Sequence, residues 1–209
     1  MHEFGSWLCR AMVVAFAVTL VDTPAQTADL YTGRQIRIAG AKADSPLPGA
    51  TDVVWISLVN VSTNGNSLQK TSGCDGCADA GAISQQQITS GSGYVQFTAS
   101  EVGTLRAIGL STGNPGTSVT EIKFALVFQP GGVAEVRESG AYRIDTPFAS
   151  GDTFRIAVQS GGGSATIRYY KNGKLIYRSA VTPEYPLLVD TALLSRSATI
   201  SNVVLYKAP

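Results

Sequence analysis

The sequence predicts an all-β fold, an antiparallel sandwich or barrel built from many short strands. In several segments apolar residues recur at every second position, which is the period of a half-buried strand. Turn signals rich in Gly, Pro and Asn separate these segments, namely TNGN, TGNPG, QPGGV and SGGGS. No segment has a persuasive helical period. Short strands at this spacing are typical of two-layer sandwiches and barrels.

The strands can be placed in order along the chain. The alternation is clearest in residues 94–100, 120–129 and 153–160, where one set of side chains should face the core. That set comprises Val95, Phe97, Ala99, Ile122, Phe124, Leu126, Phe128, Phe154, Ile156 and Val158. Weaker patterns predict strands at residues 35–40, 53–61, 105–112, 133–138, 185–193 and 198–206.

One hairpin is predicted residue by residue, in ATIRYYKNGKLIYRS at residues 165–179. Asn172-Gly173 favours a two-residue type I′ turn, because both central positions of that turn need a positive φ. Such a turn pairs Lys171 with Lys174, Tyr170 with Leu175, Tyr169 with Ile176 and Arg168 with Tyr177. Ile167, Tyr169 and Ile176 then form a core face. The opposite face carries Arg168, Tyr170, Leu175 and Tyr177, which either lie beneath a sugar ring or pack under a neighbouring loop.

The N-terminal residues look like a targeting segment. Arg10 precedes AMVVAFAVTLV, an apolar run too short to span a bilayer but typical in length of a secretory signal. We expect a signal peptide over residues 1–28, cleaved between Ala25 and Asp29, with an uncleaved membrane anchor as the alternative. The protein is then secreted, either extracellular or periplasmic. Membrane contact is expected only through an uncleaved signal.

The remaining chain is expected to form one domain. Residues 29–52 are predicted to be an N-terminal extension or linker, because KADSPLPGATD at 42–52 interrupts the strand pattern with two prolines. Residues 53–207 form the sandwich. The 209 residues, 44% hydrophobic and 15% charged, suffice for one substantial core. Sixteen basic against fifteen acidic residues, with no basic run, argue against nucleic acid as a partner.

Cys74 and Cys77 lie in a turn-forming stretch, TSGCDGCADAG, at residues 71–81. If cleavage removes Cys9, they are the remaining pair in an oxidising compartment, and a local disulfide is expected. Redox-active thiols are the first alternative, although they need a helix N-terminus after a strand. A metal site is the second, although zinc needs four ligands and the one histidine is His2.

Two stretches carry a resemblance to a known superfamily. GDTFRIAVQSGGGSATIRYYKNGKLIYRS at 151–179 resembles the strand, turn, strand and NG-hairpin pattern of concanavalin A-like lectins and glucanases, including their SPRY-type and laminin-G-type relatives. ISNVVLY at 200–206 is similar to their final strand. The layout from about residue 50 to 207 also resembles uncharacterised lectin-like domains of secreted bacterial proteins. This resemblance implies a jelly-roll sandwich of two antiparallel sheets, but a fold does not fix an activity.

The same resemblance offers a test for catalysis. Glucanases of the superfamily carry alternating acidic residues close to E-x-D-x-x-E on one strand. This chain has no such run: Glu135 and Glu138 are three residues apart and should face opposite sides, and Glu121 has no acidic neighbour two residues on. A Ser-His-Asp arrangement lacks a histidine in the mature chain. We therefore expect no enzymatic activity.

The expected function is a secreted, non-catalytic carbohydrate-binding module whose partner is a glycan or polysaccharide. The resemblance implies an aromatic platform with polar loop groups, sometimes organised by calcium. Asp75 and Asp79 are calcium candidates, although two carboxylates in a turn are more often simply solvated, and no cofactor is expected. The alternative is a structural or protein-interaction module of an extracellular assembly, with a broad apolar patch. The candidate ligand-binding residues are Trp55, Tyr142, Tyr170 and Tyr177, with Asp79 and Asn172 as polar partners.

Overall fold

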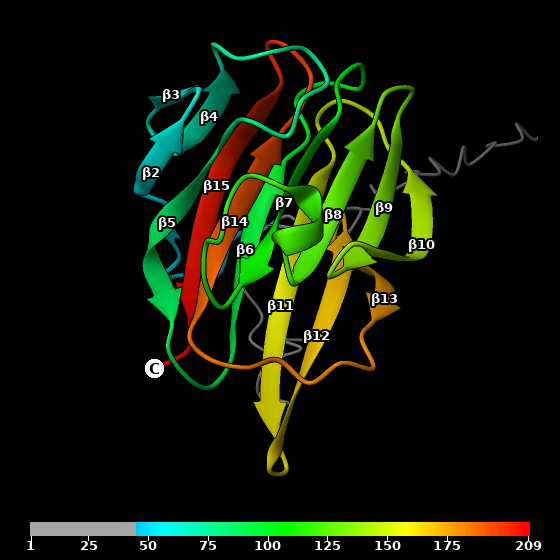
Figure 1. Cartoon of the computed structure of the whole chain (residues 1–209). Coiled ribbons are helices and arrows are strands. Elements are labelled where there is room, and N and C mark those ends of the chain that lie inside the picture. Colours follow the sequence, from blue (N-terminus) through cyan, green and yellow to red (C-terminus); the bar gives the residue numbers. More distant parts are fainter. Residues whose placement is uncertain (1–44) are drawn as a thin grey trace, which may run out of the picture.

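The computed structural model describes residues 45–209, which form a sandwich of two antiparallel sheets (Figure 1). The strands of the eight-stranded sheet are β1 (Thr51–Asp52), β3 (Val61–Asn64), β4 (Ser67–Lys70), β6 (Gly93–Thr98), β11 (Thr153–Gly161), β12 (Ser164–Lys171), β13 (Lys174–Arg178) and β15 (Thr199–Lys207). Those of the seven-stranded sheet are β2 (Trp55–Val59), β5 (Gly81–Ile88), β7 (Arg106–Ser111), β8 (Phe124–Gln129), β9 (Val133–Glu138), β10 (Ala141–Pro147) and β14 (Leu187–Leu193).

In both sheets a strand from the C-terminal part of the chain lies between two strands from much earlier in the chain: β15 lies between β6 and β4, and β14 lies between β7 and β5. The eight-stranded sheet runs β13-β12-β11-β6-β15-β4-β3, with β1 paired to β15, and the seven-stranded sheet runs β10-β9-β8-β7-β14-β5-β2. Within residues 45–209 the helical content is one 3₁₀ turn, η1 (Val119–Glu121), and no helix there is long and apolar enough to cross a membrane. The all-β, two-sheet prediction is therefore confirmed. The hairpin of β11 and β12 projects beyond the end of the sandwich (Figure 1).

The main core lies between the sheets and is rich in aromatic rings. Phe128 packs edge-on against Phe154 with ring centroids 5.0 Å apart, and Phe97 stacks on Phe154 at 6.0 Å. The residues predicted to face the core do so, with the exception of Ile122. Ile122 follows η1 and packs on the outer face of the seven-stranded sheet, because the chain enters β8 only at Phe124. The observed strand, Phe124–Gln129, therefore begins four residues later than the strand predicted at 120–129.

The predicted strand at 53–61 is wrong as a single element. It forms β2 and β3, which lie in different sheets, and Asn60 between them has a φ of 52°. Its side-chain amide donates to the Asp79 carbonyl, which holds the chain in this left-handed conformation. The strand predicted at 35–40, the signal peptide with its cleavage site, Cys9 and His2 lie outside the described residues.

The Asn172-Gly173 turn is confirmed, with φ values of 48° and 74°. Lys171 pairs with Lys174 and Tyr170 with Leu175, as predicted. Beyond these pairs a bulge shifts the register, so the predicted pairs of Tyr169 with Ile176 and of Arg168 with Tyr177 are wrong. Tyr169 instead pairs with Tyr177, and Arg168 with Arg178. Tyr177 consequently packs against the core beside Tyr169, and not on the face of Tyr170.

Candidate binding surface

An exposed polar and aromatic surface lies at the β9–β10 edge of the seven-stranded sheet. Tyr142 pairs with Arg137 and Asp145 with Glu135, so these four side chains share the outer face of the two strands. The alternate residues of β9, Val136 and Glu138, are buried toward the interior. We call the outer set of Glu135, Arg137, Tyr142 and Asp145 the β10 surface.

The polar groups of the β10 surface hold one another in place. The Tyr142 hydroxyl donates to Asp145 Oδ2 at 2.7 Å, and Arg137 Nε donates to Glu135 Oε2 at 2.6 Å. The hydrogen bond to Asp145 raises the pKa of Tyr142, and desolvation and the charges of Asp145 and Glu135 add to this effect. The phenol is therefore a neutral donor at physiological pH. Its ring remains open to solvent, because 52% of Tyr142 is exposed.

Such an arrangement suits a ligand with one apolar face and several hydroxyl groups. The flat ring of Tyr142 offers an apolar surface, and the carboxylates and the guanidinium beside it supply acceptors and donors. All four residues stand on paired strands, so little order has to be gained on binding. Among the predicted residues only Tyr142 belongs to this surface. Glu135 had been considered only as a catalytic acid, while Arg137 and Asp145 were missed, although their alternation with Glu135 and Tyr142 in VAEVRE and AYRID was a usable signal.

The other aromatic candidates lie elsewhere and are largely buried. Tyr170 is 4% exposed on the outer face of the eight-stranded sheet, where it clusters with Tyr94 beneath Leu47. Trp55 is 6% exposed and belongs to the main core, and Tyr177 is half-buried. The four aromatic candidates therefore do not lie together on one surface.

Asn172 is engaged in holding the β12–β13 turn against β11. Its Oδ1 accepts from the Thr153 amide at 2.8 Å, and its Nδ2 donates to Asp152 Oδ1 at 2.7 Å. Asp152 also pairs with Lys171 at 3.0 Å. The side-chain amide of Asn172 therefore fixes the hairpin and does not stand near Tyr142.

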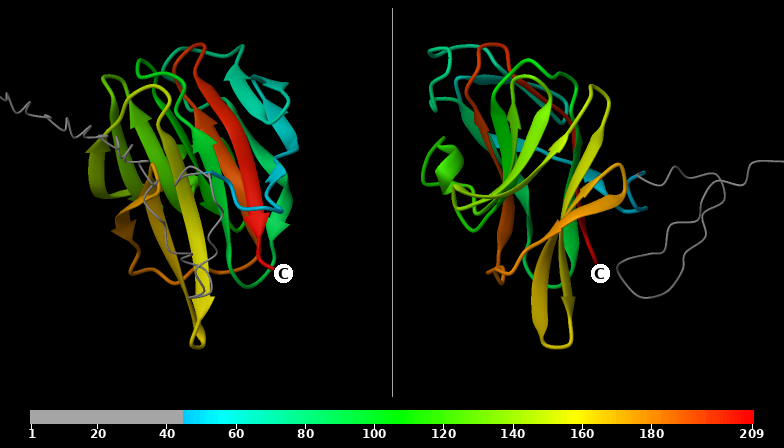
Figure 2. Two further views of the ribbon diagram at one scale, coloured as in Figure 1. Left: turned by 180° about the vertical axis from the view of Figure 1, so that it is seen from behind. Right: turned by 90° about the vertical axis from the view of Figure 1, so that its right-hand side faces the viewer.

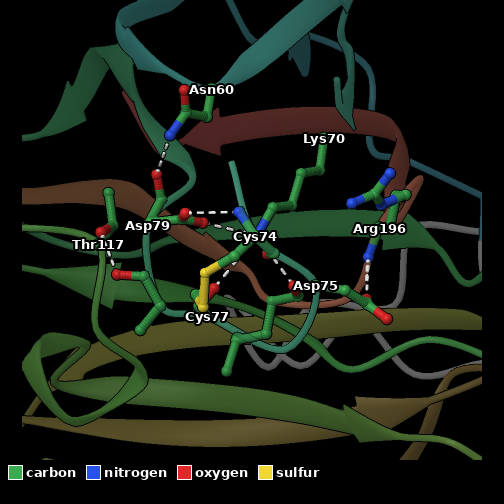
Figure 3. Close-up of a disulfide and its surroundings, with 10 residues drawn as sticks. Asn60, Lys70, Cys74, Asp75, Cys77, Asp79, Thr117 and Arg196 are labelled. Carbon is green, nitrogen blue, oxygen red and sulfur yellow. Dashed lines mark hydrogen bonds and ion pairs between the residues drawn. A yellow bond between two sulfur atoms is a disulfide. The ribbon is translucent and has the colours of Figure 1, made fainter. Parts of the chain in front are cut away.

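The cysteine turn contains a disulfide between Cys74 and Cys77, built around a buried lysine (Figure 3). The Lys70 side chain is 1% exposed, and its Nζ donates to three carbonyl oxygens and one carboxylate. The acceptors are Cys74 O at 2.8 Å, Cys77 O at 3.2 Å, Leu194 O at 2.9 Å and Asp79 Oδ1 at 2.6 Å. The two sulfur atoms are bonded to each other, so they offer no thiolate to a metal or a redox partner.

The two calcium candidates are also occupied by protein groups. Asp79 Oδ2 accepts from the Cys74 amide at 2.9 Å, and the hydrogen bond from Lys70 lowers the Asp79 pKa. Asp75 Oδ1 accepts from the Arg196 amide at 2.7 Å. The oxygen atoms that a calcium ion would need at this turn already surround the Lys70 ammonium, which supplies the positive charge itself.

A shallow depression lies at another place on the molecule, where β1 and β15 meet the end of β5. Its volume is about 190 Å³. Gln86, one of its residues, is already engaged, since it accepts from the Val54 amide and donates to the Asp52 carbonyl. The depression is lined by Gly49, Thr51, Gln86, Gln87, Leu205 and Lys207.

Comparison with known proteins identifies the fold. No family model and no curated protein matches the sequence, whereas solved structures match over most of the chain. A human SPRY domain matches 72% of this chain and 97% of its own length, with a TM-score of 0.52 and 15% identity. The TRIM65 PSpry domain matches 72% of this chain and 91% of its own length, with a TM-score of 0.51 and 13% identity.

A weaker match is the VIP36 exoplasmic/lumenal domain in its Ca²⁺/Man3GlcNAc-bound form, with a TM-score of 0.49 and 11% identity over 74% of this chain and 84% of that one. The chain has the concanavalin A-like jelly-roll fold, as the sequence resemblance implied. At such low identity the likeness shows the fold alone.

Proposed function

We propose that this chain is a secreted, non-catalytic carbohydrate-binding module that takes up a glycan at the β10 surface. The observation that carries the proposal is the placement of Tyr142, which is 52% exposed and lies beside Asp145 and opposite Arg137. A sugar ring laid on Tyr142 brings its hydroxyl groups within reach of both polar side chains. The surface is small, so we expect it to bind one or two sugar residues.

The placement of the acidic residues supports a binding role without catalysis. Glu135 and Glu138 face opposite sides of β9, as their spacing suggested, and Glu138 accepts from Arg143 and Tyr169 inside the sandwich. Glu135 is held in an ion pair with Arg137. The β10 surface lies on the open face of an edge strand, whereas a glycosidase places its two carboxyl groups on either side of the scissile bond.

Glycan-array binding followed by affinity electrophoresis tests this function. We expect Tyr142→Ala to lower affinity at least tenfold, because the variant loses the whole ring, whereas Tyr142→Phe should lose less because it keeps the ring. Leu175→Ala is the matched control, since Leu175 is 46% exposed on the other sheet. Equal binding by the wild type and Tyr142→Ala would reject the site. Release of reducing sugar from a bound polysaccharide would reject the non-catalytic assignment.

A protein-interaction role is the second candidate, and exposed apolar residues on β2 and directly before it favour it. Val54, Ile56, Leu58 and Val59 are between 39% and 50% exposed along the free edge of the seven-stranded sheet. Gathered apolar side chains of this kind often mark a protein contact. Sedimentation velocity over a range of concentrations tests this candidate. A concentration-dependent assembly that Leu58→Lys abolishes, together with no glycan binding, would favour it over the carbohydrate function.

A further inference from the structure

A buried carboxyl group lies on the outer face of the seven-stranded sheet. Asp190 of β14 is 2% exposed, and its Oδ2 has no hydrogen-bond partner among residues 45–209. Its neighbours in register are Ile83 of β5 and Gly109 of β7, neither of which offers a polar side chain. Burial with one carboxyl oxygen lacking a hydrogen-bond partner is costly for an ionised carboxylate and much less so for a neutral carboxylic acid.

The loop of residues 112–123, which contains η1, covers this part of the face (Figure 2). Val119 and Ile122 of the loop pack against a floor of small side chains. The contact is close, because a Cβ on Gly109 would lie 2.5 Å from Ile122 Cγ2. The floor consists of Ala107, Ala125, Val127 and Ala192.

Few hydrogen bonds fasten the loop to the rest of the molecule. Thr117 Oγ1 donates to the Ala78 carbonyl at 2.7 Å, and the Lys123 amide donates to Ser111 Oγ at 3.2 Å. The Lys123 carbonyl also accepts from the Ser139 amide at 3.0 Å. Within the loop, Ser118 and Glu121 form a capping box around η1. A segment held by a small apolar contact and few bonds opens locally at a low free-energy cost.

The charges around Asp190 disfavour its ionised form. Desolvation raises its pKa to about 7 and Glu121 in the loop adds repulsion, while hydrogen bonds from Ser111 and Thr191 oppose the shift. Lys123 contributes its amide to Ser111, and no ion pair to Asp190 is present among residues 45–209.

The next ionised group along the row of paired residues is Arg137. It lies three strands away from Asp190, beyond Gly109 and Ala125, at roughly 14 Å for ordinary strand spacing. It is too distant and too exposed to compensate the buried charge.

We propose that the 112–123 loop is a pH-sensitive cover, closed over Asp190 when that residue is protonated and loosened when it ionises. The loosened loop lets water reach the carboxylate and increases its separation from Glu121. Acidic medium therefore keeps the face closed. Neutral to alkaline medium exposes the floor of small apolar side chains.

The cover also touches the strand that carries Tyr142. The Ser139 amide donates to the Lys123 carbonyl at 3.0 Å, and Thr120 lies against Gly140, immediately before β10. Opening of the loop should therefore alter the β10 surface. That consequence rests on the proposed function, whereas the opening itself does not.

Hydrogen exchange of backbone amides in the full chain tests the cover without any ligand. The informative amides are those of Ile122 and Ser139, which are bonded at the loop. Protection factors, corrected for the intrinsic effect of pH, should fall about 30-fold between pH 5.5 and 8, if Asp190 has its ordinary pKa of 3.8 in the open loop. The Ser179 amide, bonded to the Ile167 carbonyl in the other sheet, is the internal reference.

Two variants distinguish loop opening that is caused by ionisation of Asp190 from a general effect of pH on the loop. Asp190→Asn keeps the shape and removes the charge, so its loop protection should stay level over the same pH range. Glu121→Gln keeps the capping box and should show a smaller fall. Level protection in the wild type, or the same fall in Asp190→Asn, would overturn the proposal. A glycan-binding failure with a normal exchange result would count only against the proposed function.

Discussion

Lys70 Nζ lies 2.6 Å from Asp79 Oδ1, and the same ammonium also donates hydrogen bonds to three backbone carbonyls. One of these carbonyls belongs to Leu194, 124 residues away in sequence, so the lysine ties the cysteine turn to the end of β14. The turn is thus organised by a charge that the chain itself provides.

Replacement of this lysine should destabilise the protein. Lys70→Met leaves three carbonyls and one carboxylate without their donor, and we expect a loss of about 2 to 4 kcal/mol in the free energy of unfolding. Urea denaturation measures the difference. Lys174→Met is the matched control, because Lys174 is exposed and should tolerate the same change. A Lys70→Met protein as stable as this control would show that the ammonium is dispensable.

Asp190 should give the stability of the protein a characteristic pH dependence. Its pKa is raised in the folded state, from 3.8 to about 7, so the folded protein binds more protons than the unfolded chain between these values. The free energy of unfolding therefore falls as pH rises from about 4 to 7, and levels off above that. Asp190→Asn should remove this slope and be roughly 2 to 4 kcal/mol more stable than the wild type at pH 8.

Urea unfolding at pH 5, 6, 7 and 8 measures both proteins under the same conditions. The difference in unfolding free energy between them should grow from pH 5 to 7 and then level off by pH 8. Parallel curves for the two proteins would mean that Asp190 does not titrate in this range.

Gly109 is expected to tolerate no side chain. A Cβ at this position would lie 2.1 Å from the Phe124 carbonyl oxygen, which belongs to the neighbouring strand and cannot move aside. We expect Gly109→Ala to lower the unfolding free energy by about 3 kcal/mol or more, measured by thermal or urea denaturation. Gly113→Ala serves as the control, since nothing lies within 4 Å of its Cβ position. Equal stability of the two variants would contradict the close packing.

Tyr170 should lose nothing when its hydroxyl is removed. The group is buried and has no hydrogen-bond partner in the described part of the chain, so Tyr170→Phe relieves a desolvation cost and should be neutral or stabilising by up to about 1 kcal/mol. Glycan binding, if present, should also be unchanged in this variant, in contrast to Tyr142→Ala. A clear loss of stability would indicate a partner for the hydroxyl that the structure does not contain.

Local sequence patterns were sufficient for the fold class and for the approximate position of many strands along the chain. Alternation placed Phe124, Leu126 and Phe128 correctly, because strand side chains point to opposite faces whatever their partners are. The Asn172-Gly173 turn was also local, since its two positive φ angles depend on those residues alone. β10 was missed because all of its residues except the partly buried Thr146 are exposed, and such an edge strand needs no apolar alternation.

The candidate site depended on contacts that sequence patterns do not contain. Tyr177 changed faces because of a one-residue bulge, which alternation cannot locate. Tyr170 does lie on an outer face, but Leu47, distant in sequence, covers it. The ion pair of Asp79 with Lys70 forms only because the chain turns back at the cysteines, which the sequence pattern does not show. The sequence shows Asp190 as an acidic residue within the apolar run YPLLVDTAL. It does not show that the 112–123 loop covers this residue.

The projecting hairpin of β11 and β12 gives the molecule a natural attachment point. Gly161, Gly162 and Gly163 at its tip have no atoms within 4 Å of their Cβ positions, and the tip lies beyond both sheets (Figure 1). A peptide tag or fluorophore inserted there should disturb neither the aromatic core nor the β10 surface. Immobilisation through this tip would present the opposite end of the sandwich to solution, in a single orientation.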